Sequence, residues 1–130
     1  MKNLEEAKKA RLNAYTPYSH FKVGAAIELK DGSFIHGANI ENAALGLCNC
    51  AERSALFSLY SQGYKKEDIK SMTVVADTNE PVSPCGSCRQ VMMELLPSDA
   101  KIILANLKDE TKEVSKSELL PFAFMTFNED

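Results

Sequence analysis

The stretches Cys50-Ala51-Glu52 and Pro84-Cys85-Gly86-Ser87-Cys88 organise the rest of this sequence. Each stretch comes just before a segment with helical periodicity. Three thiols at this spacing can bind one Zn²⁺ and leave its fourth position open, as in catalytic zinc sites. Glu52 lies two residues after the first thiol, close enough to touch whatever occupies the open position. A lone Cys-x-x-Cys would be weak evidence, but the two halves together predict a catalytic zinc site.

The bulk composition is that of an ordinary globular protein, with 45% hydrophobic and 25% charged residues in a chain of 130. We expect a single domain over residues 1–130, long enough to bury a core. The net charge of -3 and the pI near 5.4 argue against nucleic acid or a membrane as partner, because both require a basic face. No stretch resembles a membrane span or a signal peptide, so we expect a cytoplasmic protein whose cysteines serve metal binding or catalysis.

The pattern of apolar residues predicts alternating helices and strands. We expect an amphipathic helix over residues 3–15, ended by Pro17. Alternation from Phe21 to Ile27 predicts a strand, which the Asp31-Gly32 turn joins to a second one. This second strand is expected at 34–38. The remaining expected elements are strands at 72–76, 102–105 and 111–114, helices at 50–61 and 86–96, and a short helix after Ser115. This order predicts an α/β fold with a central sheet covered by helices on both faces.

The expected position of the thiols suits metal binding. Cys50 opens one predicted helix, and Cys85 and Cys88 open another. A helix N-terminus carries partial positive charge and free N–H groups, which lower the pKa of a thiol and stabilise the thiolate. Two such helix starts placed side by side can therefore hold three thiolates around one Zn²⁺.

Three thiolates leave the zinc with excess negative charge, which weakens it as a Lewis acid. We expect the planar guanidinium of Arg53 to compensate, because it can donate to two sulfurs at once. An ordinary surface position is the alternative for Arg53, and we favour that alternative for Arg89. A zinc ion with an open position lowers the pKa of bound water towards ~7. Glu52 is then suited to take up that proton and deliver it elsewhere, although first-turn glutamates are also common for helix-dipole reasons alone.

Cys48 is the remaining cysteine and has two interpretations. It can be a small buried side chain, or it can compete with Cys50 as a zinc ligand. We favour Cys50, because Cys48 precedes the helix and lacks the help of its dipole. His20 and His36 have no partner at ligand spacing, and we expect neither to bind metal.

The polar stretch Asn39-Ile40-Glu41-Asn42 precedes the first zinc half. Asn39 and Glu41 alternate, so their side chains can point the same way. An amide beside a carboxylate suits a diol such as the 2′- and 3′-hydroxyls of a sugar. An ordinary polar turn is the alternative, and we would favour it without the metal site nearby.

With these residues in place, the sequence resembles the cytidine deaminase family, in its small homotetrameric, zinc-dependent type. The resemblance runs from about Leu4 to Phe124. The matching stretches are Tyr15-Thr16-Pro17-Tyr18-Ser19, Phe21-Lys22-Val23-Gly24-Ala25-Ala26, Asn39-Ile40-Glu41-Asn42-Ala43-Ala44, Cys50-Ala51-Glu52-Arg53 and Pro84-Cys85-Gly86-Ser87-Cys88-Arg89-Gln90.

This resemblance implies a three-layer α-β-α fold with a mixed five-stranded sheet. It also implies hydrolytic deamination of cytidine and 2′-deoxycytidine in pyrimidine salvage. The implied roles are zinc binding by Cys50, Cys85 and Cys88; proton transfer by Glu52; binding of the base edge by the backbone at Ala51 and Ser83; ribose binding by Asn39 and Glu41; and packing against the pyrimidine by Phe21, with Phe124 from a neighbouring subunit.

Two positions depart from the family pattern. Relatives often carry an aromatic residue where this chain has Leu45, and glycine where it has Phe122. Both fall in expected subunit contacts, so they bear on the shared site and not on the zinc chemistry.

Other functions fit parts of the pattern. A non-catalytic zinc module would need Cys48 as a fourth ligand, and a thiol–disulfide enzyme would use Cys85-x-x-Cys88 without zinc. An aminonucleoside or nucleic-acid substrate would keep the deaminase chemistry. The acidic balance and the Asn39-x-Glu41 pair favour a free nucleoside.

Overall fold

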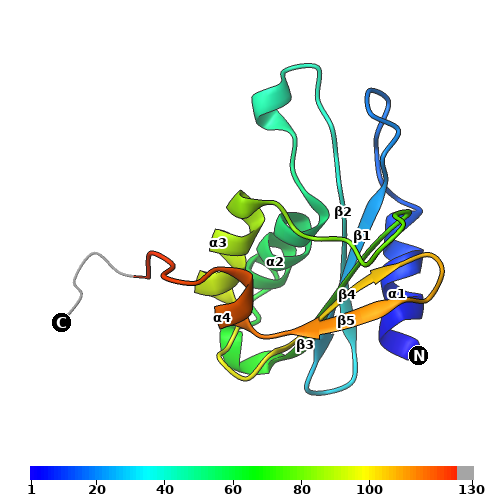
Figure 1. Ribbon diagram of the computed structural model, residues 1–130. Helices are drawn as coiled ribbons and strands as arrows, with labels where there is room; N and C mark the ends of the chain where they lie inside the picture. Colours follow the sequence, from blue (N-terminus) through cyan, green and yellow to red (C-terminus); the bar gives the residue numbers. More distant parts are fainter. Residues whose placement is uncertain (126–130) are drawn as a thin grey trace.

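A computed structural model describes residues 1–125, and its centre is a mixed five-stranded sheet (Figure 1). The strands lie in the order β2-β1-β3-β4-β5. Only β3 and β4 are parallel; the other neighbours are antiparallel. The bounds of the strands are β1 Val23–Leu29, β2 Phe34–Ala38, β3 Ile69–Ala76, β4 Lys101–Asn106 and β5 Thr111–Val114.

Helices cover both faces of this sheet, so the predicted three-layer α-β-α architecture is confirmed (Figure 1). The helix α1, Lys2–Arg11, packs on one face. The helices α2, Ala51–Ser61, and α3, Gly86–Leu95, pack on the other face, and the short α4, Lys116–Leu119, lies beside α3. Within residues 1–125, no helix is both long enough and apolar enough to span a bilayer.

The core has two parts because the central strands are buried on both sides. Met72 and Val74 of β3 face α2 and α3, whereas Val75 faces α1. This burial explains the continuous apolar run predicted for that strand. The larger cluster includes Ile27, Leu56, Leu59, Met92, Ile102 and Leu104; the smaller one is formed by Leu4, Ala7, Ala26, Val75 and Ala105.

The first helix is shorter than its apolar periodicity predicts. It ends at Arg11, and the expected extension to Tyr15 is wrong. The Tyr15 N–H donates to the Asn39 carbonyl at 3.0 Å, and the Glu41 N–H donates to the Tyr15 carbonyl at 2.9 Å. Pairing with a distant segment thus gives this backbone better partners than another helical turn. Phe21 similarly lies outside the strand predicted for it, because β1 begins at Val23.

Close contact between β2 and α2 fixes the start of the helix that carries Glu52. Gly37 of β2 lies directly under this helix. A Cβ atom added at Gly37 would lie 2.4 Å from the Ala51 carbonyl oxygen and 2.4 Å from the Ala55 nitrogen. Only glycine allows the backbones to approach so closely, so Gly37 sets the distance between the sheet and α2.

We expect Gly37→Ala to destabilise the protein by about 1–3 kcal/mol, because the new methyl group must push α2 away from the sheet. Gly46→Ala is the matched control, since a Cβ there meets no atom within 4 Å. Denaturant unfolding of both variants measures the difference. Equal midpoints for the two variants would contradict the close-contact explanation.

Candidate metal centre and active site

Three sulfurs converge where two helices begin. Cys50 is the N-cap residue of α2, Cys85 is the N-cap residue of α3, and Cys88 lies in the first turn of α3. Their Sγ atoms all lie within 4.8 Å of one another, and those of Cys50 and Cys85 are 3.9 Å apart. Tetrahedral Zn²⁺ with Zn–S bonds of about 2.3 Å places two sulfurs about 3.8 Å apart. The donor set therefore fits Zn²⁺ in both chemistry and spacing.

Cys48 lies outside this group. Its sulfur accepts a hydrogen bond from the Asn42 N–H at 3.3 Å and donates to the Asn42 carbonyl at 3.6 Å. Among residues 1–125, only Cys50, Cys85 and Cys88 form a metal-binding group of His, Cys, Asp and Glu side chains. His36 instead bonds to Glu6 at 2.8 Å. All four cysteines are free, so no disulfide joins any two of them.

Protons are shared unequally between the clustered sulfurs. A hydrogen bond from the Cys88 thiol, aided by the Arg53 guanidinium, lowers the pKa of Cys50 to about 5. The same bond raises the pKa of Cys88, and burial raises it further. Thiolates so close together repel one another, so a bound divalent cation favours full ionisation of all three.

Arg53 contacts the sulfur cluster from within α2. Its Nη2 donates to the Cys50 Sγ at 3.3 Å, and this bond to the thiolate raises the pKa of the guanidinium. The contact places a fixed positive charge beside the first thiol. The structure thus puts Arg53 where the sequence analysis expects it, and not on an exposed helix face.

Glu52 is almost completely buried beside the sulfurs, with 5% of its surface exposed. Removal from water raises the pKa of its carboxyl to about 7, and the nearby Cys50 thiolate contributes to this rise. A carboxyl with such a pKa can both release and accept a proton near neutral pH. Burial without an ion-pair partner among the described residues is unusual for a purely structural glutamate.

A cavity of about 230 Å³ opens directly onto this carboxylate and two of the sulfurs. Its wall combines apolar side chains with a few polar groups, as is usual for small-molecule sites. The lining residues are Phe21, Val23, Asn39, Cys50, Ala51, Glu52, Val82, Ser83 and Cys85. Four of the residues predicted to bind substrate, Phe21, Asn39, Ala51 and Ser83, are therefore brought together here.

Asn39 and Glu41 are both held by hydrogen bonds to the chain that precedes β1. The Asn39 amide accepts from the Val23 N–H at 2.8 Å and donates to the Phe21 carbonyl at 2.7 Å. The Glu41 carboxylate accepts from Ser19 and from the Tyr18 N–H, and these bonds lower its pKa. Asn39 lines the cavity, whereas Glu41 is not among its lining residues.

The residues that were predicted to contact neighbouring subunits are exposed in this chain. Leu45 is 76% exposed, and Phe124 lies outside the lining of the cavity in its own chain. Phe122 is fully exposed with φ of 57°, a left-handed conformation that favours glycine. Glycine would adopt this conformation more easily than phenylalanine, so the expectation of glycine at this position in relatives has a physical reason.

Two features of the site, at Val82 and Arg89, were not predicted from the sequence. Val82 lines the cavity, although its position in an irregular loop gives no sign of this. Arg89 is half-buried and bonds to the Pro84 and Leu119 carbonyls, so the surface position favoured for it is wrong. Helical side chains lean toward the helix N-terminus, and this tilt is the signal that could have placed Arg89 over the zinc loop.

Comparison with known proteins agrees with this geometry. A sequence model described as the cytidine and deoxycytidylate deaminase zinc-binding region matches residues 1–105. A cytidine deaminase of Halalkalibacterium halodurans is 59% identical over 121 residues, which cover 93% of this chain and 90% of that protein. One from Sporosarcina psychrophila is 50% identical over 123 residues, covering 95% and 89% respectively.

The fold matches solved structures equally well. The crystal structure of cytidine deaminase from Burkholderia pseudomallei superposes with a TM-score of 0.91 at 49% identity, covering 95% of this chain and 97% of that one. That of Mycobacterium tuberculosis gives 0.78 at 34% identity, covering 94% of each chain. The chain therefore belongs to the cytidine and deoxycytidylate deaminase family, and its zinc-binding region includes the cluster of Cys50, Cys85 and Cys88.

Proposed function

We propose that this protein catalyses the zinc-dependent hydrolytic deamination of cytidine and 2′-deoxycytidine, yielding uridine or 2′-deoxyuridine and ammonia. One observation carries the proposal: a buried carboxylate lines the same cavity as Cys50 and Cys85, two members of the three-sulfur cluster. Zn²⁺ bound by Cys50, Cys85 and Cys88 supplies Lewis acidity that makes water a nucleophile near neutral pH. Family membership and the names of close relatives support the choice of substrate.

Glu52 is the proton-transferring residue in this proposal. Its carboxylate takes a proton from the attacking water and delivers it to ring N3. After the hydroxyl group has added to C4, the same carboxyl moves its remaining proton to the 4-amino group, so that the C4–N bond breaks, ammonia leaves and the C4 carbonyl forms. The raised pKa of Glu52 supports both directions of transfer, because the two protonation states are close in free energy.

The surrounding residues orient the nucleoside. The backbone at Ala51 and Ser83 binds the edge of the base, and Phe21 packs against the ring. Asn39 binds the ribose with Glu41, which reaches it from the rim of the cavity. The Arg53 guanidinium offsets the excess negative charge of three thiolates through its bond to Cys50.

The active form in this proposal is a homotetramer whose sites are shared between subunits. Large apolar side chains that are exposed in one chain support it, notably Leu45, Leu47, Phe122 and Phe124. Phe124 then packs against the pyrimidine in a neighbour's cavity. Free thiols persist best in a reducing compartment, which supports a place in the cytoplasm. The proposed nucleoside substrate supports a role in pyrimidine salvage.

We expect Glu52→Ala and Glu52→Gln to lower the turnover of cytidine by at least about 10²–10⁴-fold, the usual contribution of a general acid–base group. Both variants should keep one zinc per chain, because Glu52 is not a ligand. Absorbance monitoring of cytidine turnover, together with zinc analysis, measures the two quantities. Glu94→Ala, an exposed glutamate of α3, is the control. Nearly normal turnover without Glu52 would remove it from the mechanism.

Zinc content distinguishes the three-sulfur site from one that includes Cys48. We expect Cys85→Ser to lose most of its zinc and its turnover, because the cluster keeps only two sulfurs. Cys48→Ser should retain both, since that sulfur bonds only to the Asn42 backbone. Loss of zinc from the Cys48 variant would show that the cluster has been assigned incorrectly.

A further inference from the structure

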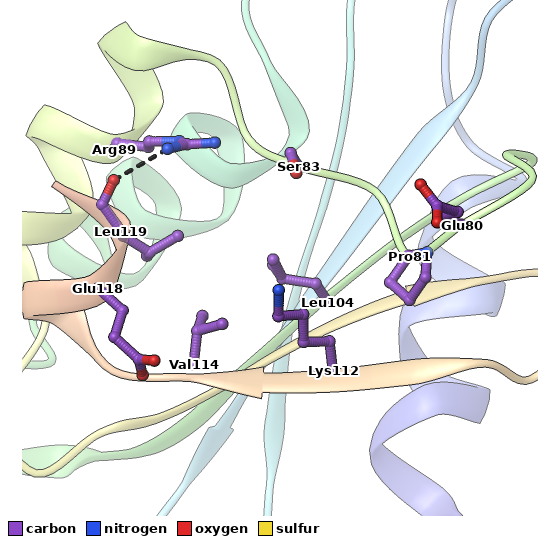
Figure 2. A pocket seen from close by; sticks show the side chains of 9 residues that line it. All are labelled: Glu80, Pro81, Ser83, Arg89, Leu104, Lys112, Val114, Glu118 and Leu119. Carbon is purple, nitrogen blue, oxygen red and sulfur yellow. Dashed lines mark hydrogen bonds between the residues drawn. The ribbon is translucent and has the colours of Figure 1, made fainter.

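Arg89 ties two segments together through their backbone carbonyls. Its Nε donates to the Pro84 carbonyl at 2.8 Å, and its Nη1 donates to the Leu119 carbonyl at 2.9 Å. Figure 2 shows the guanidinium extended along the wall of a second cavity, of about 320 Å³, with the bond to Leu119 drawn. Ser83 lines both this cavity and the one that holds Glu52, so the loop before Cys85 separates them.

The first of these bonds reaches the backbone of a metal-binding residue. The Pro84 carbonyl belongs to the peptide unit that joins Pro84 to Cys85. The Arg89 backbone N–H donates to the Cys85 carbonyl at 3.0 Å, but this is an ordinary helical bond of α3 that does not depend on the side chain; the guanidinium acts here through the Pro84 carbonyl. Cys85 is exposed and has no side-chain cap on its helix, and the loop before it lacks regular structure. The side-chain bond from Arg89 to the Pro84 carbonyl is therefore a specific constraint on the backbone that enters this ligand.

The second bond reaches the C-terminal segment, residues 119–125. Leu119 ends α4, and the next residue of α3, Gln90, donates to the Phe124 carbonyl at 2.6 Å. None of the ion pairs found within residues 1–125 involves Arg89. The guanidinium therefore bonds backbone carbonyls and not carboxylates, so its effect is to fix the position of the backbone. Its planar fork donates from two separate nitrogens, Nε and Nη1, in a fixed geometry, whereas the three donors of an ammonium group all leave from one nitrogen.

We propose that Arg89 is a positioning residue that holds the Pro84–Cys85 peptide for zinc binding and couples this loop to the segment 119–125. The inference rests on the zinc site of the proposed function, but it is independent of the substrate. A residue that orients a ligand without touching the metal changes metal affinity by about 10–100-fold when it is lost.

The test compares Arg89→Gln and Arg89→Lys with Lys116→Gln. Lys116 is a matched control, because its Nζ bonds the Leu96 carbonyl at 2.7 Å and so also ties α4 to α3, but away from the zinc loop. Zinc release to a chelator is timed for the purified holoproteins, and the visible spectrum of the Co²⁺-substituted proteins is recorded.

We expect Arg89→Gln to release zinc at least about 10-fold faster and to shift the cobalt–thiolate bands. Arg89→Lys should be intermediate, since it keeps the charge and a donor but lacks the planar fork that reaches both carbonyls from separate nitrogens. Lys116→Gln should match the wild type in both measurements.

Wild-type zinc release and an unchanged cobalt spectrum in a folded Arg89→Gln variant would overturn the proposal. Equal acceleration in Lys116→Gln would overturn it too, because a general loosening of α4 would then explain the effect. If Arg89→Gln does not fold, Arg89→Lys decides alone by the same two measurements. Should the wild type fail to deaminate cytidine while Arg89 still controls zinc release, the proposed substrate would be wrong and this inference would stand.

Discussion

The approach of two helix starts on one face of the sheet is the constraint on which the rest of the site depends. Cys50 caps α2 and Cys85 caps α3, so the sulfurs meet only if both helices begin at the same place. Gly37 sets how closely α2 lies against β2, and the parallel pairing of β3 with β4 fixes the crossover that carries α3. The core residues under both helices therefore stabilise the metal-binding geometry as well as the fold.

The meeting of the two helix starts also explains the charges of the thiolates and the raised pKa of Glu52. Helix N-termini favour thiolates, yet three thiolates repel one another and need cations nearby. Arg53 supplies one positive charge at Cys50. Glu52 is kept out of water by the same helix packing, and its raised pKa follows from this burial more than from any single neighbour. One packing arrangement thus gathers the ligands and prepares the acid–base group.

Local patterns in the sequence predict most of the fold and the three sulfur ligands of the site. The Cys-x-Glu and Pro-Cys-x-x-Cys spacings predict the sulfur cluster because each half lies within one helical turn. Apolar alternation predicts the first strand, and apolar runs predict those at 72–76 and 102–105. The predictions that were wrong or missing concern residues whose partners are distant in the sequence. Tyr15 leaves its predicted helix to pair with Asn39 and Glu41, and Arg89 turns inward to bond Leu119. Val82 lines the cavity because its N–H bonds to β4 at Ala105, a contact without a local signal.

The most direct test of the central claim is X-ray absorption at the zinc edge of the purified protein. Three sulfurs at about 2.3 Å with one lighter atom at about 2.0 Å would agree with an open site beside Glu52. Four sulfurs on the zinc would contradict it and exclude the proposed chemistry, because no position would remain for water.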